Sequence, residues 1–499
     1  MREVLKQQVE LGEYAIGEIR LDLKSRDDVP KLLLGLQYIY TTPALRQEVF
    51  DLLQEVRPAK ANGEMVSARH GRPGMDQWKI LVLGVVRLGL DADYDRLQEL
   101  ANQHRTLRQM LGHADWHDNK LYDLQTLKDN LRLFTPELLD RINQAVVRAG
   151  HVLVKKSPDE ALKGRCDSFV VETDVHFPTD INLLHDAVRK TIECCRALSD
   201  EYALPGWRQS DYHLRQFKKS YRIVQKLKHS TSKDEEVKAA KLAAAQKAHE
   251  AYLVLAQDHV ARAQQTRAQV LVAPSNIFGA VAVTELDGYL AHVVRQVHQI
   301  ERRVLKGEVI PHNEKVFSIF EPHTEWISKG KAGVPVELGV RVAILEDQHR
   351  FILHHRVMTN ETDDLVARPM VEAAQKRFPT LRVVSFDKGF HSQPNQQALK
   401  PLLDLVALPK KGRRSAADQM RENDPEFVAA RRRHSAVESA INGLEQFGLD
   451  RCPDHGLIGF QRYVALAVLA RNLHRLGAIL RTQRPRTQAK APEPVPLAA

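Results

Sequence analysis

Cysteine is scarce in this chain of 499 residues, which contains only four. They are Cys166, the adjacent Cys194 and Cys195, and Cys452, and none of them belongs to a paired Cys-x-x-Cys spacing. A disulfide framework and a structural zinc site are therefore disfavoured, and we expect four reduced thiols.

Long apolar runs are also missing. No stretch approaches the roughly 18–20 consecutive apolar residues that cross a bilayer. The N-terminus lacks the apolar core and small-residue cleavage site of a signal peptide, and neither a P-loop nor a dinucleotide-binding fingerprint occurs. We therefore expect a cytoplasmic protein that has no membrane partner and needs no nucleotide cofactor.

Acidic residues are outnumbered by basic ones. Lysine and arginine total 73 against 63 for aspartate and glutamate, which gives a net charge of +10 and a pI of about 9.3. Such a balance suits a protein that neutralises phosphates and displaces their counterions. Nucleic acid is the favoured partner, although many basic enzymes never bind it.

What is present begins with helices. Amphipathic periodicity runs through residues 1–150 and predicts a helical N-terminal domain, which we expect to bind DNA. Short helices within residues 94–110 would suit a helix-turn-helix, but ordinary bundle packing produces the same pattern.

The pattern changes at Cys166, where a β-branched and aromatic stretch predicts a strand of a second, α/β domain over residues 151–481. Within this domain, a long helical stretch over about 182–312 is interpreted as an insertion containing a helical hairpin. The later strands are expected at 315–321, 334–345, 350–357, 381–386 and 403–408, and long helices at 425–447 and 458–480. Residues 482–499 are rich in Pro and Ala without periodicity and are expected to be a disordered tail.

The insertion carries a run of basic side chains near its centre. They are Lys218, Lys219, Arg222, Lys226 and Lys228. These residues could line one side of a helix against DNA phosphates, and a solvated helix face explains them equally well.

Two carboxylates lie where an α/β site would form. Asp387 ends the apolar stretch LRVVSF, so it is expected at the C-terminal mouth of a strand, although an Asp there also caps helices. Glu438 lies beside an apolar stripe on a predicted helix, where glutamates are usually solvated. Phosphoryl transfer by two metal ions needs carboxylates that converge, because one ion activates the attacking oxygen and the other stabilises the leaving oxygen.

Several segments, in the right order, resemble the DDE transposases of bacterial insertion sequences, particularly the group called ISNCY. They are CDSFVVETDVHFPTDINLL from Cys166, FSIFEPHTEW from Phe317, SFDKGFHS from Ser385 and HSAVESAINGLEQFGLDRCPDHG from His434. The resemblance implies a ribonuclease-H-like catalytic core with a large helical insertion, preceded by an all-α N-terminal domain. It places the metal-binding catalytic acids on Asp167, Asp387 and Glu438.

The resemblance also implies partners and cofactors. Two Mg²⁺ ions are expected, for which Mn²⁺ can substitute, and double-stranded DNA is expected as the element's terminal repeats and as the target. A homodimer on DNA and a nucleoid-associated location follow from the same resemblance. The alternatives are a metal-dependent nuclease that cuts without joining and a non-catalytic DNA-binding protein derived from a transposase.

Two features depart from a simple match. Asp174 is the alternative first acid, because it lies seven residues beyond Asp167 on the same predicted strand and on its opposite face. The wider superfamily carries Tyr, Arg and Lys at −7, −4 and +7 from the third acid, where this chain has Arg431, His434 and Glu445. Glu445 cannot replace a cation. The residues still expected to contact DNA phosphates here are Arg431, Arg432, Arg433 and His434.

Overall fold

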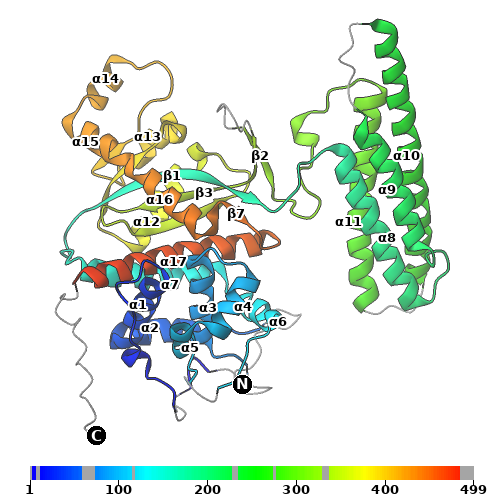
Figure 1. The fold of residues 1–499 in the computed structure, drawn as a ribbon. Helices are drawn as coiled ribbons and strands as arrows, with labels where there is room; N and C mark the ends of the chain where they lie inside the picture. The colour runs from blue at the N-terminus through cyan, green and yellow to red at the C-terminus, as the bar shows by residue number, and fades with distance from the viewer. Residues whose placement is uncertain are drawn as a thin grey trace. The chain divides into compact units, whose positions relative to one another are not determined.

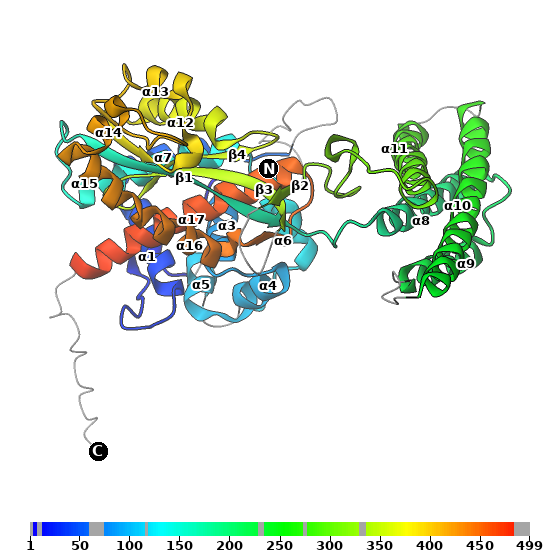
Figure 2. The ribbon, with the colours of Figure 1, turned by 90° about the horizontal axis from the view of Figure 1, so that it is seen from above.

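The computed structural model describes residues 3–6, 12–58, 74–114, 118–227, 234–272, 277–328 and 336–483. The chain divides into two compact units, both drawn in Figures 1 and 2. The core unit comprises Met1–Asp174 and Ile327–Ala499, and the helical unit comprises Val175–Trp326.

A mixed sheet of seven strands carries the core unit (Figure 1). Its strands are β1 (Leu162–Thr173), β2 (Glu325–Ser328), β3 (Val336–Glu346), β4 (Ile352–Met358), β5 (Leu381–Phe386), β6 (Leu405–Ala407) and β7 (Arg451–Cys452). The central strand β1 is antiparallel to β3 and parallel to β5. Strand β4 extends the antiparallel side and β6 extends the parallel side. This mixed order fits a ribonuclease-H-like core.

Successive residues of β1 face two different hydrophobic cores, as the pleat of a strand requires. Leu162 and Cys166 pack in one cluster with residues of α12 (Asp363–Arg377) and α13 (Gln393–Leu399). Phe169, at an odd-numbered position, packs in a second and larger cluster. Both faces of the sheet are therefore covered, and polar residues on β1 are exceptions that need a reason.

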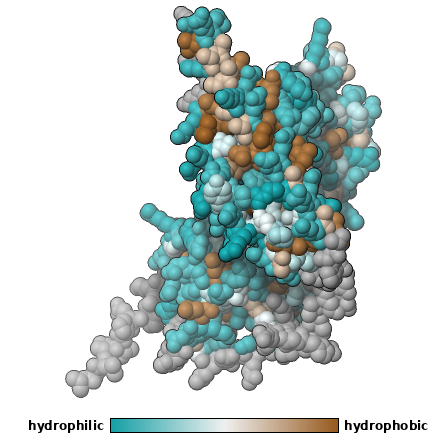
Figure 3. Space-filling view, turned by 90° about the vertical axis from the view of Figure 1, so that its right-hand side faces the viewer, coloured by the Kyte–Doolittle hydropathy of each residue, from teal (hydrophilic) through white to brown (hydrophobic). Residues whose placement is uncertain are grey.

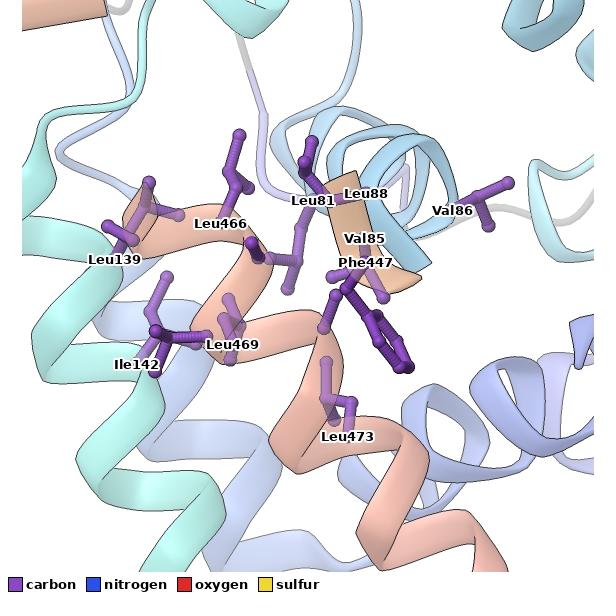
Figure 4. Packing of buried hydrophobic residues seen from close by; sticks show 14 of the residues in the cluster. Leu81, Val85, Val86, Leu88, Leu139, Ile142, Phe447, Leu466, Leu469 and Leu473 are labelled. Carbon is purple, nitrogen blue, oxygen red and sulfur yellow. The ribbon is translucent and has the colours of Figure 1, made fainter. Parts of the chain in front are cut away.

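The larger cluster is organised around α17 (Leu457–Gln483). The helices of the N-terminal third are α1 (Val29–Thr41), α2 (Pro43–Leu53), α3 (Gln77–Gly89), α4 (Tyr94–Gln103), α5 (Arg105–Met110), α6 (Leu124–Leu131) and α7 (Pro136–Leu153). Figure 4 shows Leu469 and Leu473 of α17 in this cluster with Val85 of α3 and Ile142 of α7. By length and composition α17 could cross a membrane, but 72% of its most apolar stretch is buried inside the protein.

The N-terminal helices do not form a unit of their own. The sequence predicts a separate domain over residues 1–150, whereas α1, α3 and α7 pack directly on α17 and share the core unit with the sheet. The reason is that α17, from the far end of the chain, packs against the apolar faces of these helices. Periodicity shows that a helix has an apolar face but not which partner buries it.

Residues 94–110 left two interpretations open, a helix-turn-helix and ordinary bundle packing, and the structure favours the second. Helices α4 and α5 are joined by His104 alone, whose ring accepts a hydrogen bond from the backbone N–H of Leu107. A helix-turn-helix needs a turn of about three to four residues. Leu107 and Met110 of the six-residue α5 are buried in the core, so this pair is ordinary bundle packing.

The helical unit is built from four long helices. They are α8 (Asp180–Tyr202), α9 (Ser210–Lys226), α10 (Glu235–Val272) and α11 (Ile277–Ile300). Leu184, Phe217, Tyr252 and Leu286, one from each helix, share a single hydrophobic cluster. The expected insertion over about 182–312 thus corresponds to a bundle with its own core. Figure 3 shows a largely hydrophilic surface interrupted by apolar side chains.

The strand expected at 315–321 is wrong, because these residues are irregular. The hydroxyl of Ser318 accepts hydrogen bonds from the backbone N–H groups of Phe320 and Glu321, at 3.2 and 3.0 Å. A serine that captures nearby backbone donors in this way removes them from a ladder.

The C-terminal helices also differ in detail. In place of one helix over 425–447, α15 (Pro425–His434) and α16 (Ala436–Leu444) are separated at Ser435. Helix α17 extends to Gln483. Of the expected disordered tail over 482–499, residues 484–499 lie outside the described residues.

Helices α1 and α17 cross so closely that only glycine fits at the contact. A Cβ added at Gly477 would lie 2.0 Å from the carbonyl oxygen of Lys31, and one at Gly35 would lie 2.6 Å from that of Leu473. We predict that Gly477→Ala lowers the free energy of unfolding by about 1–3 kcal/mol, the usual cost of overpacking a core, as measured by chemical denaturation.

The matched control lies in the same helix. A Cβ at Gly459 meets its nearest neighbours at 3.6 Å, an ordinary contact, so Gly459→Ala should leave stability unchanged or raise it slightly. Equal effects of the two substitutions would show that the close α1–α17 crossing is not what constrains Gly477.

Candidate functional site

The pairing of β1 with β5 places two acids side by side. These strands are parallel, and their ladder ends with Cys166 opposite Phe386. The next residues of the two strands are Asp167 and Asp387. Strand β5 stops there while β1 continues to Thr173, so both carboxylates lie at the C-terminal mouth of β5, where sites form in parallel sheets.

Asp387 is held by the turn that follows its strand. Its carboxylate accepts a hydrogen bond of 3.3 Å from the backbone N–H of Gly389, at the start of the short helix η4 (Lys388–Phe390). Asp387 is itself exposed. The capping role weighed from sequence is therefore present, and it leaves the acid open to a ligand.

Asp167 has the most perturbed carboxyl of the site. Its pKa is raised to about 6, chiefly by burial and additionally by the negative charges of Asp387, Asp363 and Glu438, against a hydrogen bond from the backbone N–H of Ser168. That hydrogen bond measures 2.8 Å. The three predicted acids therefore act on one another electrostatically, as groups that share a site must.

Glu438 reaches the site from a helix. It lies in the first turn of α16, and α16 packs against β1. Its side chain is exposed, and a carboxylate in the first turn is favoured by the helix dipole. The third acid thus comes from an element on the same side of the sheet as the odd-numbered residues of β1.

Asp363 is a fourth carboxylate that the sequence did not reveal. It is the first residue of α12, and its Oδ1 accepts a hydrogen bond of 2.6 Å from the hydroxyl of Ser168. A Cβ added at Gly389 would lie 2.7 Å from its Oδ2. Its sequence context is an acidic helix start, which is a common structural signal, and its partner on β1 is distant in the chain.

His434 lies among these acids at the end of α15. Its Nδ1 is 3.1 Å from the hydroxyl of Ser385, while its Nε2 is buried and has no hydrogen-bond partner among the described residues. Burial lowers the pKa of His434, although the charges of Asp387 and Glu438 oppose this. Burial therefore favours the neutral form of His434, whose second ring nitrogen is unused among the described residues.

The alternative first acid has a different environment. Asp174 forms a 2.5 Å ion pair with Arg451, and both side chains are 51% exposed. Seven residues of strand span about 23 Å, so Asp174 lies far along β1 from the pair formed by Asp167 and Asp387.

The donor chemistry of the site suits a hard divalent cation. Carboxylate oxygens are the preferred ligands of Mg²⁺ and Mn²⁺, and the mutual repulsion at Asp167 is what a bound cation would relieve. In the described part of the chain, however, no three His, Cys, Asp or Glu side chains are already arranged to hold one ion. The carboxylates are the type of ligand that such a metal prefers, but the acids would have to move closer together to bind it.

The basic candidates fall in both units. Lys218, Lys219, Arg222 and Lys226 are exposed on α9 of the helical unit, while Lys228 lies outside the described residues. Arg431, Arg432 and Arg433 are exposed in the last turn of α15. None of these seven described side chains takes part in an ion pair with another described residue.

Comparison with known proteins gives one match. The family model described as the transposase DDE domain matches residues 310–473, which include Asp387 and Glu438 but not Asp167. No curated protein and no solved structure matches the chain. The matched segment supports a DDE transposase and, with the mixed sheet, a ribonuclease-H-like core.

The raised pKa of Asp167 makes the metal-free site a source of instability. An ionised carboxylate whose folded pKa is about 6 and whose ordinary value is 3.8 destabilises the fold above about pH 6, and the penalty disappears as the pH falls towards 4. We predict that Asp167→Asn raises the free energy of unfolding of the metal-free protein by about 1–3 kcal/mol at about pH 7.5.

The same denaturation measured near pH 4 should show almost no difference between wild type and Asp167→Asn. Asp174→Asn, just beyond the end of β1, is the control and should change stability by less than about 0.5 kcal/mol at either pH. A gain that persists unchanged at the lower pH would contradict the raised pKa of the Asp167 carboxyl.

Proposed function

We propose that the chain is a DDE transposase, which cuts and rejoins DNA strands by two-metal-ion phosphoryl transfer. The observation that carries this is the match of residues 310–473 to a transposase domain on a sheet whose register brings Asp167 beside Asp387. Glu438, on α16 against β1, completes the proposed triad. The fold alone would support many activities, whereas this set of acids fits phosphoryl transfer.

Asp167, Asp387 and Glu438 would hold two Mg²⁺ ions, or Mn²⁺ in their place. Bound there, the ions supply Lewis-acid activation of the attacking oxygen and stabilise the leaving oxygen. In the first step a water oxygen bonds to phosphorus and the 3′-oxygen leaves; in the second, that 3′-hydroxyl attacks target DNA. Both steps exchange one phosphorus–oxygen bond for another, so no covalent link to the protein is needed.

The other residues of the site act on the acids and the DNA. Ser168 ties β1 to α12 through Asp363, which fixes the backbone beside Asp167. The buried Nε2 of His434 has no partner among the described residues, and it would hydrogen-bond a phosphate oxygen if DNA binding exposed it. Arg431, Arg432 and Arg433 supply positive charge at the same helix end.

The partners proposed are the element's terminal repeats and a target duplex. Because two ends have to be joined to one target, the proposal includes a homodimer on DNA. A nucleoid-associated, cytoplasmic location without a membrane partner belongs to the same proposal.

The triad is tested by cleavage and joining of labelled DNA carrying the borders of the element. We predict that Asp167→Asn, Asp387→Asn and Glu438→Gln each reduce Mg²⁺-dependent cutting by at least about 100-fold while DNA binding is retained. Asp174→Asn should cut like wild type, because its carboxylate is paired with Arg451.

Each other result has a definite meaning. A dead Asp174→Asn with an active Asp167→Asn would replace the first acid. Cutting without insertion into a second duplex would make the chain a nuclease, and binding without cutting would make it a non-catalytic relative.

The basic face of α9 is tested separately by the salt dependence of DNA binding. If Lys218 and Lys219 contact phosphates, replacing both by Gln should reduce the slope of log K against log salt by about 1–2. Lys241→Gln/Lys247→Gln, on exposed positions of α10, is the matched control and should leave the slope unchanged. Equal slopes for all three proteins would show that α9 presents only a solvated face.

A further inference from the structure

A small recess of about 40 Å³ opens on the core unit, lined by Lys163, Arg165, Ser385, Gln348 and Arg433 among others. Strands β1 and β5 form its floor, the β3–β4 turn contributes Gln348, and α15 contributes Arg433. None of these residues except Arg433 belongs to the site described above as an acid or a DNA contact.

Register connects this recess to the acids. Lys163 pairs with Val383 and Arg165 with Ser385, and two residues further along each strand come Asp167 and Asp387. Residues two apart on a strand share a face and are about 6.6 Å apart. The basic residues and the acids therefore form one continuous row on one face of the two strands.

Arg165 is fixed in place within the floor. Its Nη2 donates hydrogen bonds of 2.7 Å to Glu346 and 2.7 Å to the carbonyl oxygen of Asp347. Its Nε is buried and has no partner among the described residues. The guanidinium is thus held rigidly by a carboxylate on one side and has an unused donor.

Two further cations at the recess are exposed. The ammonium of Lys163 and the guanidinium of Arg433 form no ion pair with any described residue; Arg433 donates only to the carbonyl oxygen of Ala429 in its own helix. The carboxylates around the recess are Glu346, which pairs with Arg165 at 2.7 Å, and Glu160, which lies 3.1 and 3.2 Å from Gln348 and His349. The three cations Lys163, Arg165 and Arg433 therefore face two carboxylates.

We propose that this recess binds a phosphate of the DNA strand, the one next to the phosphate that is cut. Lys163 and Arg433 are its charged contacts, and the guanidinium of Arg165 lies in its floor. The proposal rests on the function proposed above, since the acids define which phosphate is cut. Cations and N–H donors that converge on a small volume suit a phosphate, and the recess is too small for a base. The row of basic residues and acids along β1 and β5 sets the direction in which the DNA strand passes the acids.

The first experiment measures binding without cutting. A fluorescent duplex is titrated without divalent metal at several salt concentrations, using wild type, Lys163→Gln/Arg433→Gln and Arg382→Gln. The double variant should lower the slope of log K against log salt by about 1, the value for one phosphate. Arg382 is the control, because it is exposed on β5 at the register shift before Val383 and does not line the recess.

The second experiment places the phosphate. Wild-type cutting should fall about tenfold when one phosphate adjacent to the cut is replaced by a neutral methylphosphonate, the loss of a good charged contact. The double variant should cut ordinary DNA about tenfold more slowly and be indifferent to the replacement. Thermal melts check that the substitutions, both at exposed positions, leave the fold intact.

The inference is overturned if the double variant keeps the wild-type slope, if Arg382→Gln lowers the slope equally, or if a cutting double variant still responds to the neutral phosphate. If wild type binds DNA but never cuts it, the proposed function fails. The inference then fails too, because it defines its phosphate as the neighbour of the one that is cut. A lowered slope in that case would leave a phosphate site on a DNA-binding protein, which is a different conclusion.

Discussion

The register between β1 and β5 is the constraint on which the site depends. Because Cys166 lies opposite Phe386, Asp167 and Asp387 are neighbours. The same register pairs Arg165 with Ser385, whose hydroxyl lies 3.1 Å from the Nδ1 of His434. A slip of one residue would turn every one of these side chains to the other face of the sheet. The buried Cys166 and Phe386 share one hydrophobic cluster, so apolar packing on one face fixes the polar row on the other.

Helix α17 gives this sheet its support. It is buried among α1, α3 and α7, and Asn472 within it bonds to Asn143 of α7 and to the backbone of Ile352 in β4, at 2.7 and 3.0 Å. A fully buried amide satisfied in this way specifies one arrangement of the three elements. The N-terminal helices therefore act as a scaffold for the sheet.

Local signals in the sequence predicted local structure well. The strand expected at 381–386 is β5, because a buried apolar run that ends in Asp-Lys-Gly carries its own boundaries. Strand β1 begins at Leu162, four residues before the expected start at Cys166. The intervening Lys163-Gly164-Arg165 stretch has little β propensity, so the sequence did not predict it as strand. It is extended because it pairs with β3 and β5. Propensity describes a segment, whereas pairing belongs to the whole sheet.

Long-range relations could not be read in this way. Asp363 became part of the site only through Ser168, which is 195 residues away in the chain. The separation of residues 1–150 as a domain failed for the same reason, because the apolar partner of α1 is α17. Asp167 and Glu438 were predicted through family resemblance, while the register that brings Asp167 beside Asp387 appears only in the folded chain.

The acids differ in exposure and in the element that carries each of them. Asp167 lies inside a strand paired on both sides, and its pKa is raised to about 6 chiefly by burial, to which the charges of Asp387, Asp363 and Glu438 add. Asp387 and Glu438 are exposed at element ends, and Glu438 follows the break at Ser435. In the proposed metal site, Asp387 and Glu438 would therefore approach Asp167 from exposed positions. A bound cation would offset the negative charge that adds to the raised pKa of Asp167.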